Sequence, residues 1–165
     1  MKLNNDDFLG VIKNAPLFAI DLVVVNEKRE ILVGKRLNPP AKSWWFVPGG
    51  RVYKNEALHD AFKRIAIVEL GLFCELDQEY SLGLFEHFYE DSALSDKVST
   101  HYINAPYLVI CNKTNISAPH TQHSEYRWIS VEEVQKDASV HQYSKVFISA
   151  LEEKLSGAGR AKGPL

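Results

Sequence analysis

The chain has 165 residues, of which 45% are hydrophobic and 24% are charged, a composition typical of one globular domain with its own core. It excludes collagen-like, coiled-coil and largely disordered proteins. The 19 basic and 21 acidic residues give a net charge of −2, so the chain lacks the positive charge that nucleic acid or an anionic membrane attracts, and we expect neither partner.

The N-terminal residues are polar and acidic, where a secretory signal peptide would need an apolar stretch. The most apolar segment, residues 17–25, is too short to cross a bilayer and has Asp21 at its centre. Cys74 and Cys111 are typical of structural thiols in a reducing compartment. We therefore expect a cytoplasmic protein.

Capping residues, apolar periodicity and β-branched runs predict the elements of the first half of the chain. Asn4 or Asn5 can cap an opening helix that Pro16 ends, and a polar turn joins the next two runs into an antiparallel pair. Gly71 stands where the C-terminal cap of a second helix is expected. The predicted elements are a helix at 4–13, strands at 17–25, 31–36 and 44–47, and a helix at 56–70.

The second half of the chain alternates strand-like runs with polar stretches. Ser130 is placed to cap a short helix, and a long polar connection precedes it. The predicted elements are strands at 80–89, 101–111 and 126–129, a loop at 112–124, and helices at 130–134 and 139–155. Residues 156–165 are glycine-rich and basic, so we interpret 1–155 as the domain and the rest as a flexible tail.

The most informative stretch runs from 50 to 72. Glycine, glutamate, arginine, glutamate, glycine and leucine occur there at fixed spacing, at Gly50, Glu56, Arg64, Glu69, Gly71 and Leu72. This pattern resembles the Nudix box. The residues themselves indicate diphosphate chemistry, because a helix N-terminus after a glycine-flanked turn favours anions and a carboxylate on that helix can bind Mg²⁺. The alternative is a surface helix with scattered charges.

The resemblance to the Nudix family implies an α/β fold. The expected architecture is a Nudix-type α/β/α sandwich with a mixed sheet, as a single domain, and the resemblance further implies a homodimer.

Ile65 and Val68 depart from the box, which has glutamate at both positions. Ordinary members use several carboxylates there to bind divalent ions and to orient the water that attacks phosphorus. Without these acids, the chain is either a non-catalytic binding module or an enzyme with a different reaction on the same scaffold.

The departures resemble one branch of the family, GDP-mannose mannosyl hydrolase, as far as about residue 155. The matching segments are 32–36, 45–52, 69–72, 87–89, 100–102, 122–123 and 126–128. The resemblance implies hydrolysis of a nucleotide sugar, GDP-mannose and also GDP-glucose, to GDP and free hexose, by water attack at sugar carbon one with inversion. The alternatives are a conventional pyrophosphatase, which would release GMP and a sugar phosphate, and a silent nucleotide-sugar binding module.

The resemblance also implies the metal site and the base. Mg²⁺, or Mn²⁺ in its place, would be bound by the Gly49 carbonyl, the Glu69 carboxylate and the Gln122 amide, with diphosphate oxygens completing the coordination. His123 would be the general base, since a neutral imidazole can take a proton from the attacking water. The alternatives are an exposed loop amide at Gln122 and, for His123, a solvent-facing histidine or a zinc pair with His120.

Basic residues would surround the substrate. Arg36, Arg51 and Arg64 would bring positive charge to the diphosphate and the departing oxygen, and Tyr102 would donate a hydroxyl hydrogen bond. Arg64 can also pair with Glu56 and fix the loop.

The remaining candidates are expected to bind the sugar and the guanine base of the substrate. Asp21 is unfavourable among apolar neighbours unless it is paired or faces a polar pocket, so we expect sugar-hydroxyl recognition by Asp21 and His87, with a buried structural hydrogen bond as the alternative. The family's guanine-binding N-terminal segment corresponds here to Lys2, Leu3 and Phe8, although Phe8 can equally belong to the core.

Overall fold

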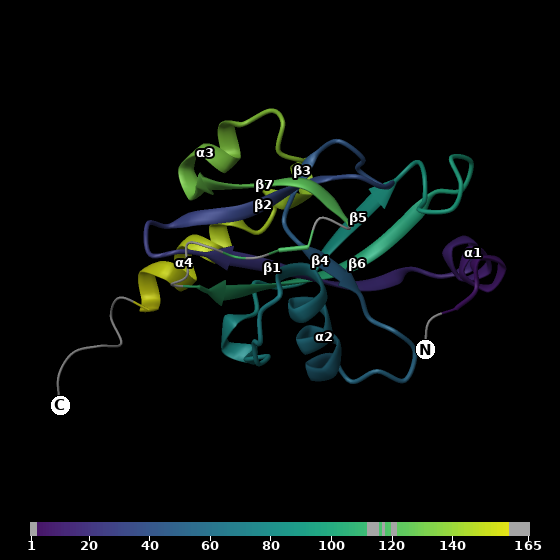
Figure 1. Ribbon diagram of the computed structural model, residues 1–165, viewed down its shortest axis with the longest axis horizontal. Helices are drawn as coiled ribbons and strands as arrows, with labels where there is room; N and C mark the ends of the chain where they lie inside the picture. Colours follow the sequence, from purple (N-terminus) through teal and green to yellow (C-terminus); the bar gives the residue numbers. More distant parts are fainter. Residues whose placement is uncertain (1–2, 112–115, 117, 120–121, 159–165) are drawn as a thin grey trace.

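Strand β1 (Leu17–Val25) lies at the centre of a seven-stranded mixed sheet (Figure 1). It pairs in parallel with β6 (Thr100–Ile110) along its full length and antiparallel with β4 (Gly49–Arg51). The computed structural model describes residues 3–111, 116, 118–119 and 122–158. The other strands are β2 (Glu30–Arg36), β3 (Trp45–Phe46), β5 (Phe85–Tyr89) and β7 (His123–Ser130).

Helices cover both faces of this sheet, with α2 on one face and α3 and α4 on the other (Figure 1). They are α1 (Asn5–Asn14), α2 (Leu58–Leu70), α3 (Val131–Lys136) and α4 (Ile148–Ala158), with 3-10 turns η1 (Gln78–Tyr80) and η2 (Gln142–Ser144). None of the helices in the described part of the chain combines the length and apolar character that a bilayer crossing requires.

The core forms two layers because successive side chains of β1 point to opposite faces. Ile20, Leu22 and Val24 pack against α2. Val23 and Val25 pack with residues of α3 and α4. The predicted α/β/α sandwich with a mixed sheet is therefore confirmed.

Several predicted helix ends are also confirmed. The Asn4 side chain accepts a hydrogen bond from the Asp7 amide at 2.9 Å and caps α1. Gly71 ends α2 in the left-handed conformation, with φ of 65°. Ser130 caps α3 by accepting from the Glu133 amide at 3.2 Å.

Other boundaries differ from the predictions. The strand expected at 80–89 is limited to β5, because Gly83 adopts φ of 109° and interrupts the extended run. The last helix begins at 148 rather than 139, and it ends at 158 rather than 155. In the preceding segment the side chain of His141 accepts a hydrogen bond from the Tyr143 amide at 3.2 Å and caps η2 instead.

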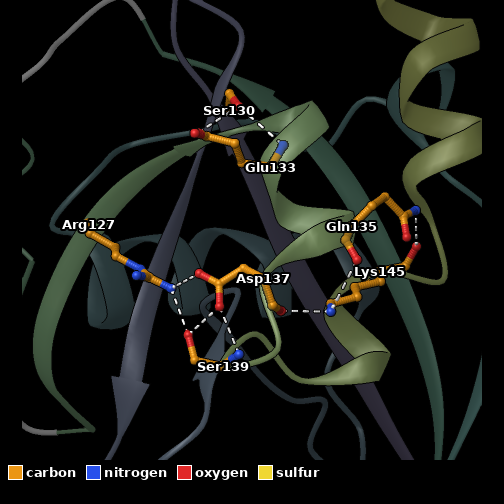
Figure 2. Close-up of polar contacts among 7 residues, drawn as sticks. All are labelled: Arg127, Ser130, Glu133, Gln135, Asp137, Ser139 and Lys145. Carbon is orange, nitrogen blue, oxygen red and sulfur yellow. Dashed lines mark hydrogen bonds and ion pairs between the residues drawn. The ribbon is translucent and has the colours of Figure 1, made fainter.

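Polar contacts fix the segment between α3 and η2 to the sheet, as Figure 2 shows. Arg127 of β7 donates from Nη2 to Asp137 Oδ2 at 2.7 Å and to Ser139 Oγ at 3.1 Å. The Lys145 ammonium donates to the Asp137 carbonyl at 2.8 Å. These contacts hold the chain that leads to His141 close to the sheet.

Candidate active site

A cavity of about 460 Å³ brings together side chains from α1, the sheet and α2. Most of the predicted site residues line it, namely Phe8, Asp21, Arg36, Gly49, Arg51, Arg64, Glu69, His87, Tyr102 and Gln122. Leu3 and His123 are described but are not among the lining residues, and Lys2 lies outside the described residues. The structure therefore brings most of the predicted residues together in one cavity.

The loop before α2 is fixed by a bidentate ion pair. Arg64 donates from Nε to Glu56 Oε1 at 2.6 Å, from Nη2 to Glu56 Oε2 at 2.8 Å, and from Nη2 to the Arg51 carbonyl at 2.9 Å. These hydrogen bonds hold the pKa of the Glu56 carboxyl below its usual value. Glu56 lies outside α2, which begins at 58 rather than 56. Its ion pair with Arg64 compensates much of the Arg64 charge within the protein.

The carboxylate of Glu69 projects from α2 into the cavity with only 4% of its side chain exposed. Its Oε1 accepts a hydrogen bond from Gln122 Nε2 at 3.0 Å. Burial raises the pKa of Glu69 to about 7, although Arg36, Arg64 and Gln122 act in the opposite direction. A buried carboxylate of this kind gains from a nearby cation.

Candidate oxygen donors for a divalent ion line the same cavity. Gly49 and Gln122 line the cavity together with Glu69, and together they provide a carboxylate, an amide oxygen and a backbone carbonyl, the ligand types that Mg²⁺ prefers. Among the described residues no group of three or more His, Cys, Asp and Glu could bind a metal. His120, the other half of the zinc alternative, lies outside the described residues. The residues present fit a cation that shares its coordination with substrate oxygens.

The two aliphatic residues of the box differ in environment. Ile65 is 1% exposed and packs against Gly50, where an added Cβ would lie 3.0 Å from Ile65 Cγ1. Val68 is 48% exposed at the edge of the cavity. This part of the cavity wall is therefore apolar, and Glu69 is the carboxylate that α2 contributes to it.

Two residues that line the cavity carry buried polar atoms without a hydrogen-bond partner among the described residues. Asp21 forms a hydrogen bond with Asn104, whereas its Oδ2 has no hydrogen-bond partner among the described residues. Burial raises the pKa of the Asp21 carboxyl to about 7. His87 Nε2 is also buried and unpartnered in the described structure, and its ring stacks on Tyr143 at 4.2 Å between centroids. Such atoms can bind the hydroxyl groups of a sugar.

His123 is the first residue of β7, and it is 1% exposed rather than part of an open loop. Its ring lies over Gly34, where an added Cβ would come within 2.5 Å of His123 Cγ. Nδ1 lies 3.2 Å from the Tyr126 hydroxyl, which donates to the Pro119 carbonyl at 3.0 Å. Nδ1 therefore carries the ring hydrogen, and Nε2 is left as an acceptor without a described partner.

Sequence reasoning missed several residues of the cavity. Asn104 is 3% exposed on β6, and a polar residue inside a buried strand was the available signal. Tyr53 and Tyr89 also line the cavity. Tyr53 lies in the loop between β4 and α2, where no periodic pattern indicates which side chains face inward.

The fold and this cavity define a class of α/β proteins in which a glycine-flanked turn and the following helix carry the site. The model of the NUDIX domain family matches residues 16–151. The chain therefore belongs to the Nudix family of hydrolases.

Three similar proteins illustrate the range of this family. The low-salt glycan biosynthesis protein Agl8 of Haloferax volcanii is 40% identical over 126 residues, which cover 76% of this chain and 78% of that protein. The MutT protein of Methanosarcina mazei Go1 is 18% identical and covers 86% of this chain and 97% of its own, with a TM-score of 0.70. The NUDIX domain of Shewanella oneidensis NrtR, solved with ADP ribose, is 15% identical, and the match covers 93% of this chain and 99% of that chain with a TM-score of 0.66.

Proposed function

We propose that this protein hydrolyses GDP-mannose, and also GDP-glucose, to GDP and free hexose with Mg²⁺ or Mn²⁺. The distribution of charge in the cavity carries the proposal. Arg36 and Arg51 form no ion pair within 4.0 Å with a described residue, so both are available to a diphosphate. The unpartnered atoms of Asp21 and His87 lie in the same cavity and suit a sugar.

The proposed reaction breaks the bond between sugar carbon one and the diphosphate oxygen. A water oxygen bonds to carbon one from the opposite side, GDP departs with the bonding electrons, and the water proton passes to His123 Nε2. Attack opposite the leaving group inverts carbon one. Arg36 and Arg51 stabilise the departing diphosphate, Arg64 fixes the loop before α2 through Glu56, and Tyr102 donates a hydrogen bond to the diphosphate. Because His123 is enclosed, this role requires the chain at Gln122 to admit water to Nε2.

The divalent cation would be held by the Gly49 carbonyl, Glu69 and Gln122, and it supplies positive charge that stabilises the diphosphate leaving group. A leaving group stabilised in this way does not need the second carboxylic acid that ordinary glycosidases use. The apolar side chains of Ile65 and Val68 are consistent with this, since attack at phosphorus in ordinary members uses the acids absent here.

The comparisons support a substrate that contains a sugar. The relative at 40% identity is named as a glycan biosynthesis protein. Guanine as the base, mannose as the sugar and a homodimer as the assembly rest on the resemblance of the sequence to the GDP-mannose mannosyl hydrolase branch. Assaying a panel of nucleotide sugars with Mg²⁺ tests the first two, and light scattering after gel filtration tests the third.

Product analysis in ¹⁸O-labelled water tests the reaction. We expect GDP and mannose as products, with the label in mannose. Label in GMP or in mannose phosphate would establish a pyrophosphatase, and absence of any product would establish a binding module. A parallel reaction with EDTA is the control, and it should yield no product if the cation is required.

A further inference from the structure

The guanidinium of Arg51 contacts aromatic rings rather than carboxylates. Its Cζ lies 3.8 Å from the centroid of the Phe8 ring and 5.4 Å from that of Tyr53. It forms no hydrogen bond or ion pair with a described residue, although it lines the cavity. The Arg51 carbonyl accepts from Arg64, so the backbone below this side chain is fixed.

Contact through the flat face leaves the edges of a guanidinium free. An aromatic ring attracts the face of the cation, whereas phosphate oxygens bind its N–H groups along the edge. A ring therefore orients an arginine without occupying the donors that a diphosphate needs. An acidic partner would instead compete with the substrate for the same donors.

The position of Phe8 is determined by α1. Asn4 caps this helix, and the Phe8 amide donates to the Asn4 carbonyl at 3.0 Å in its first turn. Ile12, one turn further on, is buried at 6% exposure, and α1 contacts β6 of the sheet. The Phe8 ring thus reaches the cavity from an element that is itself docked in place.

We infer that Phe8 is a positioning residue for Arg51, so that α1 forms part of the diphosphate-binding site. The inference rests on the proposed function, in which Arg51 binds the diphosphate. Because Arg51 covers one face of the Phe8 ring, only the opposite face is left for contact with a guanine base. Tyr53 contributes a second aromatic contact to the same guanidinium.

Calorimetric titration of the full chain with inorganic pyrophosphate and with GDP, both with Mg²⁺, distinguishes positioning of Arg51 by Phe8 from contact of Phe8 with the guanine base. Phe8→Leu removes the ring and keeps an apolar side chain, and we expect it to weaken binding of both probes about three- to tenfold. Phe8→Tyr keeps the ring and should bind within about twofold of wild type. In an Arg51→Gln background, Phe8→Leu should add less than about twofold to the loss of GDP affinity.

Other outcomes overturn the inference. A loss with GDP but not with pyrophosphate would mean that Phe8 contacts the base, and unchanged binding of both probes, or no pyrophosphate binding by wild type, would also contradict it. Should Phe8→Leu fail to fold, Phe8→Met, which also removes the ring and keeps an apolar side chain, repeats the comparison with Phe8→Tyr. Phe73→Leu is the matched control, since that ring is 92% exposed and lines a separate groove.

This experiment is independent of the test of the proposed function. Pyrophosphate binding does not depend on which bond of the substrate breaks. Label recovered in a phosphate product would therefore overturn the proposed reaction and leave the role of Phe8 standing.

Discussion

At the scale of single residues, the imidazole of His123 is buried, and its Nε2 atom has no hydrogen-bond partner among the described residues. Burial lowers its pKa to about 4, and the charge of Arg36 acts in the same direction. The ring is therefore neutral near neutral pH, and its hydrogen on Nδ1 directs the lone pair of Nε2 away from Tyr126. A base needs this state, since a protonated imidazole cannot accept the proton of water.

Replacing His123 with glutamine should lower turnover by about two to four powers of ten while KM changes little, because glutamine keeps polar atoms but accepts no proton. Steady-state kinetics with GDP-mannose measures the effect. His59→Gln is the matched control, as this helix residue is 61% exposed and should retain wild-type turnover. A loss below about tenfold in His123→Gln would remove this residue from the role of base.

The sequence indicated some of these residues better than others. Glu56, Arg64 and Glu69 belong to one loop and one helix, so their spacing alone determines how they meet. The burial of His123 depends on Gly34 in another strand, which leaves the space that the imidazole fills. No local pattern reports such a contact, so the sequence predicted the residue but placed it on an open loop.

At the scale of elements, α2 has two distinct sides at the cavity. Ile65 faces the sheet, where it packs in the same core cluster as Ile20 and Phe62. Val68 lies about one turn further on and is about half exposed. A carboxylate should therefore destabilise the fold at position 65 and leave its stability unchanged at position 68.

Val68→Glu should fold with wild-type stability, because the new carboxylate remains in contact with water. Ile65→Glu should lower the free energy of unfolding by about 3 kcal/mol or more, because it buries a charge in the core. Urea unfolding measures both, and equal losses would contradict this placement. Product analysis of Val68→Glu should still give GDP, since one added acid does not rebuild the cluster of the box.

Element boundaries were predictable from the sequence where they depend on neighbouring residues, and not where they depend on contacts between distant segments. The caps at Asn4, Gly71 and Ser130 were predictable because each cap depends on its own side chain and backbone. The start of the last helix was not, since the apolar spacing after 139 resembles a helix although His141 and Tyr143 form a separate turn. The start of β7 depends on its pairing with β2, in which Arg36 lies opposite His123.

At the scale of the whole molecule, buried histidines and buried acids oppose each other in the dependence of stability on pH. Burial lowers the pKa of His87 and of His141 to about 4, as it does for His123. Burial raises the pKa of Asp21 and of Glu69 to about 7. Between about pH 4.5 and 6.5 the unfolded chain binds more protons at the histidines, and the folded chain binds more at the acids, so the two effects partly cancel.

A single substitution isolates one of these contributions. The pKa of His87 is 6.5 in its ordinary state and about 4 when folded, because of burial and, to a lesser extent, His141. The unfolded state therefore binds the extra proton, and the stability that His87 contributes is present above about pH 6.5 and is lost as the pH falls toward 4. His87→Phe removes this proton, so its stability relative to wild type should rise by about 1 kcal/mol for each unit that the pH falls between 6.5 and about 4. Urea unfolding of both proteins, followed by the fluorescence of the 3 tryptophans, measures the difference at several pH values. For the exposed control His59→Gln, the plot of unfolding free energy against pH should be parallel to that of wild type. A parallel plot for His87→Phe would contradict the prediction, because it would show that His87 binds its proton equally in both states.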